Sequence, residues 1–219
     1  PAPEPPAKKV IVTAGADVPS LYMFRGIRQE YDPQFTIQPF LDIGVTVSDT
    51  ATVNFGSWNS FHSGSNKDLG SRGMHAWYES DIYGIATFTA GKTKPGVQWT
   101  SYTSPDSDYK TVNELAFFVG FDDSKNAVPV SPKVLVGFET TDGQADAGAN
   151  KGVYLELSAK PSHKLGTSPV TLNIPLKLGM SLKDYYENRD PVTGLLTGTD
   201  SKFGYFDIGA NISVPVGIG

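Results

Sequence analysis

Twelve consecutive residues, 172–183, alternate without interruption between apolar side chains and polar or small ones. A period of two predicts a β-strand, because successive side chains of a strand point to opposite faces. Strands of soluble domains mostly run about 5–6 residues. A strand that crosses a bilayer at a tilt needs roughly 9–11 residues. The length of this segment therefore raises the question of whether its apolar face meets a protein core or lipid.

The same alternation recurs along the rest of the chain, and no segment of useful length has the period of a helix. The alternating segments predict about ten strands, within the range of 8 to 26 found in outer-membrane barrels. The clear strands are 37–47, 113–122, 134–139, 152–158, 172–183 and 205–214, and weaker ones fit 10–25, 51–61, 75–89 and 96–104. We expect residues 10–219 to form a single all-β domain, an antiparallel up-and-down transmembrane β-barrel.

The connections between these strands mostly alternate between short turns and longer polar loops. Short turns are expected at 48–50, 90–95 and 163–169, and longer loops at 26–36, 62–74, 140–151 and 188–202. Outer-membrane barrels have short periplasmic turns at one end and long external loops at the other. Two connections depart from the rule, since 105–110 is short and 123–132 is long. This pattern predicts a periplasmic N-terminus.

Composition excludes several classes of protein. The net charge is -5, which gives no reason to expect nucleic acid as a partner. No cysteine is present, so disulfides and thiolate chemistry are ruled out. No apolar run approaches the roughly 18 residues of a membrane helix. The Pro/Ala-rich start, residues 1–9, is typical of a mature N-terminus left after removal of a signal peptide.

Two interpretations compete for the apolar faces. In a secreted β-sandwich or lipocalin-like barrel, those faces would form a protein core, and the opposite faces would be rich in solvated polar residues. Here the opposite faces mix Gly, Ser, Asn, Tyr and Phe with single acids. Such a mixture suggests a second, confined face, as in the lumen of a barrel. The pattern favours the membrane barrel, although prolines at 39, 175 and 215 must then fit at bulges or at a seam.

Two short motifs carry a family resemblance. The first is 22–27, Tyr-Met-Phe-Arg-Gly-Ile, and the second is 55–64, Phe-Gly-Ser-Trp-Asn-Ser-Phe-His-Ser-Gly, followed by Trp-Tyr-Glu-Ser-Asp at 77–81. Together they resemble the TorF-type porin family, an uncharacterised outer-membrane family known for a Gly-Cys-Trp motif. Ser57 stands where that Cys would be. The resemblance is sharpest over about 20–120 and implies an outer-membrane barrel of about twelve strands with no established substrate.

The chain departs from such barrels at its C-terminal end, because 213–219 lacks the terminal aromatic strand that they use for insertion. The resemblance therefore suggests that one final hairpin is missing from this sequence. A closed ten-stranded barrel is the alternative.

Charged residues on the polar faces are the candidate site residues. The residues expected to line the lumen are Asp42, Glu79, Asp81, Glu114, Glu139, Glu156, Lys177, Lys183 and Asp207, and Asp122 is expected there too. One interpretation is an acid-lined pore that favours cations or small polar solutes. The other is a plugged polar core of ion pairs and aromatics. Arg25 is a candidate rim latch, because its planar fork suits a bidentate pair with Glu79, Asp81 or Glu114.

Two further groups of residues have weaker interpretations. Aromatic residues near strand ends suit interfacial girdles: Trp58, Trp77, Trp99, Tyr22, Tyr78, Tyr102, Tyr185 and Tyr186. Trp77 has the alternative of facing inward beside Glu79. Ser60, His62 and Ser63 at one rim would suit a hydrolase, but the sequence contains no Gly-x-Ser-x-Gly elbow. The Gly-rich segment 140–151 has neither EF-hand nor P-loop spacing and is expected to be a flexible external loop.

The sequence thus predicts a Gram-negative outer-membrane β-barrel that acts as a porin or narrow channel for small polar solutes or cations. Its expected partners are the lipid bilayer, lipopolysaccharide and other envelope proteins, and we expect no cofactor and no enzymatic activity. The alternatives are a non-conducting structural or partner-binding barrel and a hydrolase at the rim.

Overall fold

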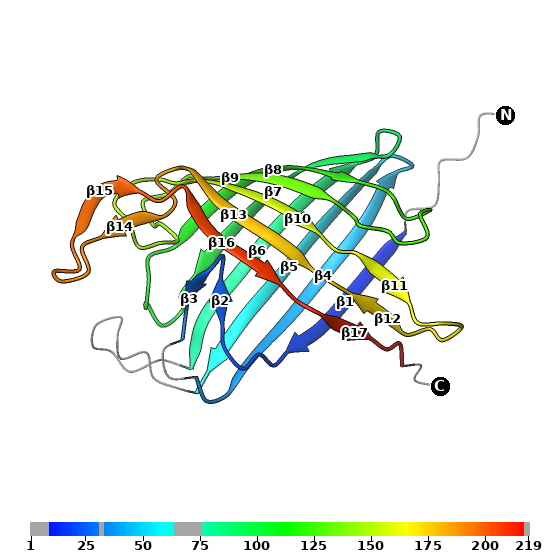
Figure 1. Cartoon of the computed structure of the whole chain (residues 1–219), viewed down its shortest axis with the longest axis horizontal. Helices are drawn as coiled ribbons and strands as arrows, with labels where there is room; N and C mark the ends of the chain where they lie inside the picture. The colour runs from blue at the N-terminus through cyan, green and yellow to red at the C-terminus, as the bar shows by residue number, and fades with distance from the viewer. Residues whose placement is uncertain (1–8, 31–32, 64–75, 217–219) are drawn as a thin grey trace.

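The computed structural model describes residues 9–30, 33–63 and 76–216. Within them the structure is all-β and is dominated by one antiparallel sheet of ten strands (Figure 1). Its strands, in spatial order, are β1 (Val10–Asp17), β4 (Thr36–Ser48), β5 (Ala51–His62), β6 (Trp77–Phe88), β7 (Thr93–Thr103), β8 (Val112–Phe121), β9 (Lys133–Glu139), β10 (Val153–Ala159), β13 (Leu176–Lys183) and β16 (Phe203–Ile208). Each strand of this sheet pairs with the sheet strand that follows it in the sequence, so the predicted up-and-down order is confirmed.

The sheet curls but does not close. In Figure 1, β13 and β16 lie in front of β4 and β5, which form the far wall. Within the described residues, β1 pairs only with β4, and β16 pairs only with β13. The expectation of a closed ten-stranded barrel is therefore wrong for this structure, in which β1 and β16 are the two edges of an open sheet.

The long segment 172–183 forms two strands, because Pro175 interrupts it. β12 (Thr171–Asn173) ends before the proline and β13 begins after it. β12 pairs with β11 (Ser162–Lys164) and with β17 (Asn211–Ser213) in a small three-stranded sheet that continues β10, β13 and β16. The carbonyl of Pro175 still accepts a hydrogen bond from the Gly209 amide at 2.9 Å. Pro175 therefore removes one backbone hydrogen-bond donor, but the chain continues in the same direction from β12 into β13.

The loops gather by length at the two ends of the sheet. Among the described residues, one end, the long-loop end, carries 18–30, 104–111, 140–152 and 184–202, and the other, the turn end, carries 49–50, 89–92, 122–132 and 165–170. The expected loop 62–74 lies largely outside the described residues, as does the expected tail 1–9 apart from Lys9. Two hairpins stand at the long-loop end: β2 (Met23–Phe24) with β3 (Ile27–Arg28), and β14 (Glu187–Arg189) with β15 (Leu196–Asp200).

The two faces of the sheet differ in polarity, and the apolar one is exposed. On the convex face, Ile82 and Phe117 are each 52% exposed. Other exposed apolar side chains in register on this face are Val10, Val12, Leu41, Ile43, Phe55, Phe88, Trp99, Val119, Val134, Phe138, Leu157, Phe206 and Ile208. Among the described residues, no helix is long and apolar enough to cross a membrane.

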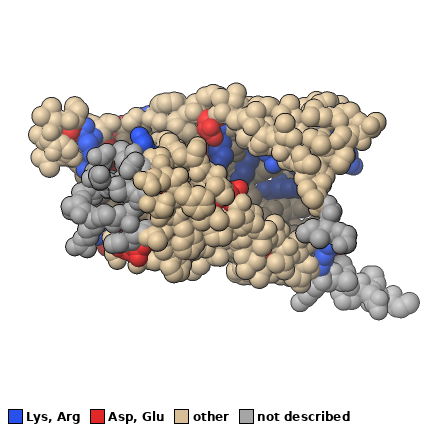
Figure 2. Space-filling model, turned by 90° about the horizontal axis from the view of Figure 1, so that it is seen from below, with Lys and Arg blue, Asp and Glu red and all other residues tan. Residues whose placement is uncertain are grey.

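The concave face is polar and aromatic, and its long-loop half is filled. Buried groups there include Glu79, Asp81, Glu114 and Glu139, with Tyr78, Tyr154 and Tyr185 packed among them. In the turn-end half, concave residues such as Thr13, Thr52, Lys177 and Asp207 are exposed. The interior is therefore packed at one end and open at the other. Figure 2, seen from below, shows an opening into the molecule with lysine or arginine atoms inside it.

Candidate functional site

A tight hairpin carries Arg25 into the concave side of the sheet. Phe24 pairs with Ile27, so Arg25 and Gly26 form a two-residue turn, and both have positive φ (48° and 78°). That conformation defines a type I′ turn, whose first position normally takes Asn, Asp or Gly. An arginine there is conformationally unfavourable, which indicates that this position is occupied for its side chain. Gly26 is required on steric grounds as well, because a Cβ would lie 2.6 Å from Cβ of Tyr205.

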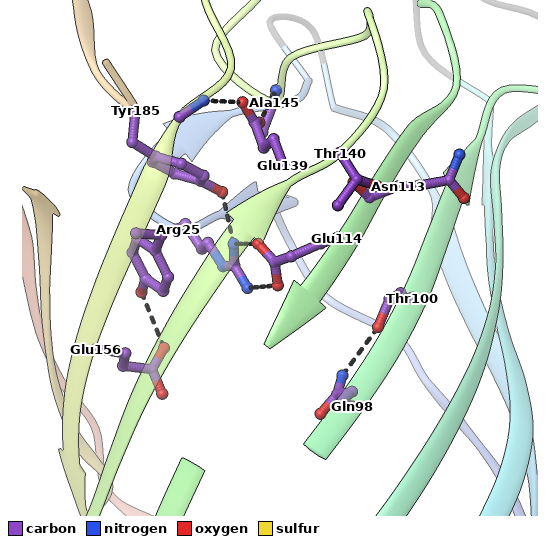
Figure 3. A network of polar contacts seen from close by, with 12 residues as sticks. Arg25, Gln98, Thr100, Asn113, Glu114, Glu139, Thr140, Ala145, Glu156 and Tyr185 are labelled. Carbon is purple, nitrogen blue, oxygen red and sulfur yellow. Dashed lines mark hydrogen bonds and ion pairs between the residues drawn. The ribbon is translucent and has the colours of Figure 1, made fainter. Parts of the chain in front are cut away.

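The guanidinium of Arg25 binds Glu114 in a bidentate pair (Figure 3). Its Nη1 lies 2.5 Å from Oε2 and its Nη2 lies 2.8 Å from Oε1 of Glu114. Nη1 also donates to the Tyr185 hydroxyl at 2.7 Å, and the guanidinium carbon lies 4.0 Å from the centre of the Tyr154 ring. This buried cage fixes the hairpin to β8 and β10. We call Arg25 and Glu114 the latch.

Both sides of the latch are shaped to receive it. The Tyr186 hydroxyl donates to the carbonyl of Arg25 at 3.1 Å, so the backbone of the turn is held as well. Gly137 lies beneath the carboxylate, and a Cβ at that position would be 2.7 Å from Cδ of Glu114. Of the three acids considered as partners of Arg25, Glu114 is the one that the fold brings to it. The latch lies inside the sheet at the long-loop end, deeper than a rim contact.

The other two acids form a separate cluster on β6. The Tyr22 hydroxyl donates to Glu79 Oε2 at 2.9 Å, and Tyr22 is itself buried at the base of the hairpin. Asp81 lies one concave position further along the strand and is also buried. Glu139, on β9, accepts the amides of Ala145 and Gly152, both at 2.7 Å. These acids are therefore packed into the wall and the loops, and they do not present free carboxylates to a pore.

The remaining predicted lumen residues occupy different environments. Asp42 accepts from Nδ2 of Asn54 at 2.7 Å and from the Tyr83 hydroxyl at 3.1 Å. Glu156 accepts from the hydroxyls of Tyr154 (2.9 Å) and Tyr205 (3.3 Å). Lys177 and Asp207 are directly opposite each other and exposed on the concave face of β13 and β16.

Lys183 does not line the interior, and this prediction is wrong. A register shift between Val153 and Tyr154 places Lys183 opposite Val153 on the face of Leu155, at the end of β13. Its side chain is 71% exposed and pairs with Asp184 at 3.8 Å. Strict alternation along 172–183 missed the bulge, which reverses the facing of a strand beyond it.

Most of the predicted girdle aromatics point inward. Tyr22, Tyr78 and Tyr185 are buried, and Trp58 contacts Tyr22 with ring centres 5.3 Å apart. Trp99 is exposed on the convex face. Trp77 is exposed and stacks on Phe61, because a register shift after Ser60 turns it away from Glu79. Each of the three tyrosine hydroxyls has a polar partner in the interior: that of Tyr22 donates to Glu79, that of Tyr78 donates to Gln29, and that of Tyr185 accepts from Arg25.

Loop 140–152 is fastened to the β14–β15 hairpin. Asp146 accepts the amides of Glu187 (2.7 Å) and Gly148 (2.8 Å), while burial raises the pKa of its carboxyl. Glu187 in return accepts the amides of Ala149 and Asn150. The loop expected to be flexible is therefore pinned by reciprocal hydrogen bonds to its neighbour.

Ser60, His62 and Glu30 form a series of polar contacts that resembles a hydrolase triad. Ser60 Oγ lies 2.6 Å from His62 Nε2, and His62 Nδ1 lies 3.6 Å from Glu30 Oε1. However, Ser60 is 0% exposed, and Gln38 Nε2 donates to its Oγ at 3.2 Å. Glu30 also accepts from the Thr36 hydroxyl and the Tyr22 amide. A nucleophile must reach a carbonyl beside oxyanion donors, and this hydroxyl is enclosed. We interpret the series as a structural clamp between 22–38 and β5.

We expect Ser60 to be unreactive. A fluorophosphonate probe added to the folded protein should leave Ser60 unlabelled, because the hydroxyl is enclosed and already hydrogen-bonded. Ser60→Ala should lower the free energy of unfolding by about 1 kcal/mol, the usual net value of a lost hydrogen bond. Intact-mass spectrometry checks the labelling, and denaturant titration checks the stability. Labelling that disappears in Ser60→Ala would contradict the structural interpretation.

Sequence reasoning missed three residues that matter to the interior. Glu30 gave no signal because it lies in a predicted loop with no strand pattern around it. The sequence pattern predicts Lys94 in a turn and Lys133 next to one, whereas in the structure β7 and β9 include them. The cross-strand register that places the lysines on one row emerges only in the folded sheet.

Comparison with family models, with curated proteins and with solved structures finds no match to this chain. The resemblance to the TorF-type family therefore stays a prediction, carried by its two motifs. The described residues also contain no group of three or more His, Cys, Asp or Glu side chains that could hold a metal ion.

Proposed function

We propose that this protein is an outer-membrane β-barrel that acts as a narrow channel for small polar solutes. The observation that carries the proposal is the exposed apolar convex face, which extends over strands from β1 to β16. A water-soluble protein rarely exposes contiguous apolar patches larger than a few hundred Å². A bilayer offers such a surface a favourable environment across the whole sheet.

The polar interior supports the same proposal. Soluble β-barrels bury apolar side chains inside and solvate the outside. Here the arrangement is reversed, with acids, lysines and tyrosine hydroxyls on the concave face. The open edges, β1 and β16, must be paired in a membrane, since unpaired backbone groups cost several kcal/mol each in hydrocarbon. Pairing of both edges in the bilayer is therefore part of the proposal.

The channel is narrow because the β2–β3 hairpin occupies the interior at the long-loop end. Arg25 and Tyr22 attach this hairpin to β8 and β6 from the inside. In the orientation that we propose, the turn end and N-terminus are periplasmic, and the latch lies toward the outside. The bilayer and lipopolysaccharide would be its surroundings.

A second candidate is a non-conducting barrel that serves structure or partner binding. The specific observation in its favour is the burial of the latch and its neighbours: Glu79, Glu114, Tyr154 and Tyr185 are at most 4% exposed. Side chains packed this closely leave little space for water beside the hairpin. We further propose that neither form is an enzyme, because the triad-like series found in the described part of the chain is enclosed.

Planar-bilayer recording separates the two candidates. Refolded protein should give a band shifted by heating on semi-native gels, and then small, discrete current steps after insertion. Shifted bands without current at any voltage would favour the non-conducting barrel. The absence of a shifted band, with the protein remaining soluble without detergent, would contradict both membrane proposals.

A further inference from the structure

The open half of the interior carries a row of lysines. Lys94 on β7 pairs with Gly120, and Gly120 pairs with Lys133 on β9. Lys133 pairs with Ser158, and Ser158 pairs with Lys177 on β13. Directly opposed residues share a face, so these side chains form one level across the concave wall. Lys94, Lys133 and Lys177 are called the lysine row.

The three lysines differ in their partners. Lys94 Nζ binds Asp122 Oδ2 at 2.8 Å, so its charge is neutralised locally. The ion pairs found among the described residues include neither Lys133 nor Lys177. Lys133 has its Nζ 4.3 Å from the centre of the Phe118 ring, which holds the ammonium on the wall without neutralising it.

The carboxylates near this row keep their charge, but none forms an ion pair with Lys133 or Lys177. Glu156 accepts two tyrosine hydroxyls, and Asp122 binds Lys94. Asp207 is opposite Lys177 in register but forms no ion pair with it within the described part of the chain. Lys133 and Lys177 thus have ammonium groups that no carboxylate binds directly, which leaves their N–H donors available to an anion.

The spacing suits one small oxyanion. Lys133 and Lys177 are separated by one strand, which places their Cα atoms about 10 Å apart. Lysine side chains are long and flexible, so both ammonium groups can reach an ion lying over the strand between them. Ser158 stands on that strand and offers a hydroxyl donor. An oxyanion has several acceptor lone pairs, which three such donors can satisfy.

We infer that Lys133, Ser158 and Lys177 form a binding station for small oxyanions, such as a carboxylate or a phosphate, in the turn-end half of the interior. As a selectivity element, this inference rests on the proposed channel. It replaces the cation preference expected from the sequence, because four of the acids that suggested it, Glu79, Glu114, Glu139 and Glu156, are hydrogen-bonded in the wall.

Two measurements test the inference. In the first, detergent-folded protein is treated with an amine-acylating reagent, and the rate at each lysine is read by peptide mass spectrometry. Inorganic phosphate should slow acylation at Lys133 and Lys177 several-fold. It should leave Lys183 and Lys202, which lie outside the station, unchanged. Ser158→Ala should weaken the protection.

In the second, reversal potentials are recorded across bilayers in a KCl gradient. Wild-type current should be selective for chloride, the Lys133→Gln/Lys177→Gln variant should shift toward potassium, and Asp207→Asn should strengthen the anion preference. Lys183→Gln is the matched control and should change nothing. Absent protection, or wild-type current selective for potassium, overturns the inference. Protection without any current overturns the channel and leaves the oxyanion station standing.

Discussion

Replacing Phe117 by arginine should destabilise the protein in a bilayer by about 2–4 kcal/mol, the cost of an arginine on the lipid face near the midplane. Phe117 lies in the middle of β8 on the convex face and is 52% exposed. Its flanking partners in the sheet are Val97 and Val136. If lipid covers this face, the guanidinium must be desolvated or must distort the bilayer to reach water. Urea titration of the protein folded in phospholipid vesicles measures the difference.

Two companion variants identify the cause. Phe117→Leu removes the edge contact with Phe138, whose ring centre lies 6.2 Å away, without adding charge, so it should cost about 0.5–1.5 kcal/mol. Thr13→Arg places the same charge on the exposed concave face of β1, and its effect should stay within about 0.5 kcal/mol. The opposite pattern, in which Phe117→Arg is harmless and improves solubility in water, would show that the convex face meets solvent.

The sequence predicts most of the strands of the large sheet, because apolar and polar residues alternate wherever one face is consistently apolar. Segment 37–47 becomes β4, and 134–139 becomes β9, each within a residue or two at either end. The errors arise where the period breaks. Pro175 divides 172–183, and the shift at Val153 reverses Lys183. Closure of the sheet was not predictable, because pairing between β1 and β16 depends on tilt and register summed around all the strands.

The candidate site was predictable only in part. The chemistry of Arg25 beside Gly26 identifies it as a candidate. Its carboxylate partner, Glu114, lies 89 residues further along the chain. Burial of Glu79 and Asp81 was not visible, because alternation assigns a face but gives no measure of how full that face is. The β2–β3 hairpin, which lies inside the curled sheet, determines how much of the concave face is buried. It fills the long-loop half and leaves Lys177 and Asp207 exposed and Lys133 partly exposed in the other half.

Arg25→Ala should release the hairpin and increase the single-channel conductance several-fold. Removing one partner of a buried pair costs about 3–5 kcal/mol, because the remaining charge loses its compensation. Here that charge is Glu114, which is 3% exposed. The backbone of the turn would then be held mainly by Tyr186, through one hydrogen bond of 3.1 Å. Conductance in planar bilayers and the temperature at which the heat-shifted band converts measure the two effects.

Three further variants assign these effects to the latch. Glu114→Gln should also raise conductance but cost less stability than Arg25→Ala, because glutamine still accepts one hydrogen bond at that position. Arg25→Lys should fall between wild type and Arg25→Ala, since an ammonium retains the charge and loses the bidentate fork. Lys151→Ala breaks an exposed pair with Asp142 and should leave the conductance unchanged. If Arg25→Ala lowers stability with conductance unaltered, the hairpin does not limit the passage of ions, and the narrowest point of the interior must lie elsewhere along the concave face.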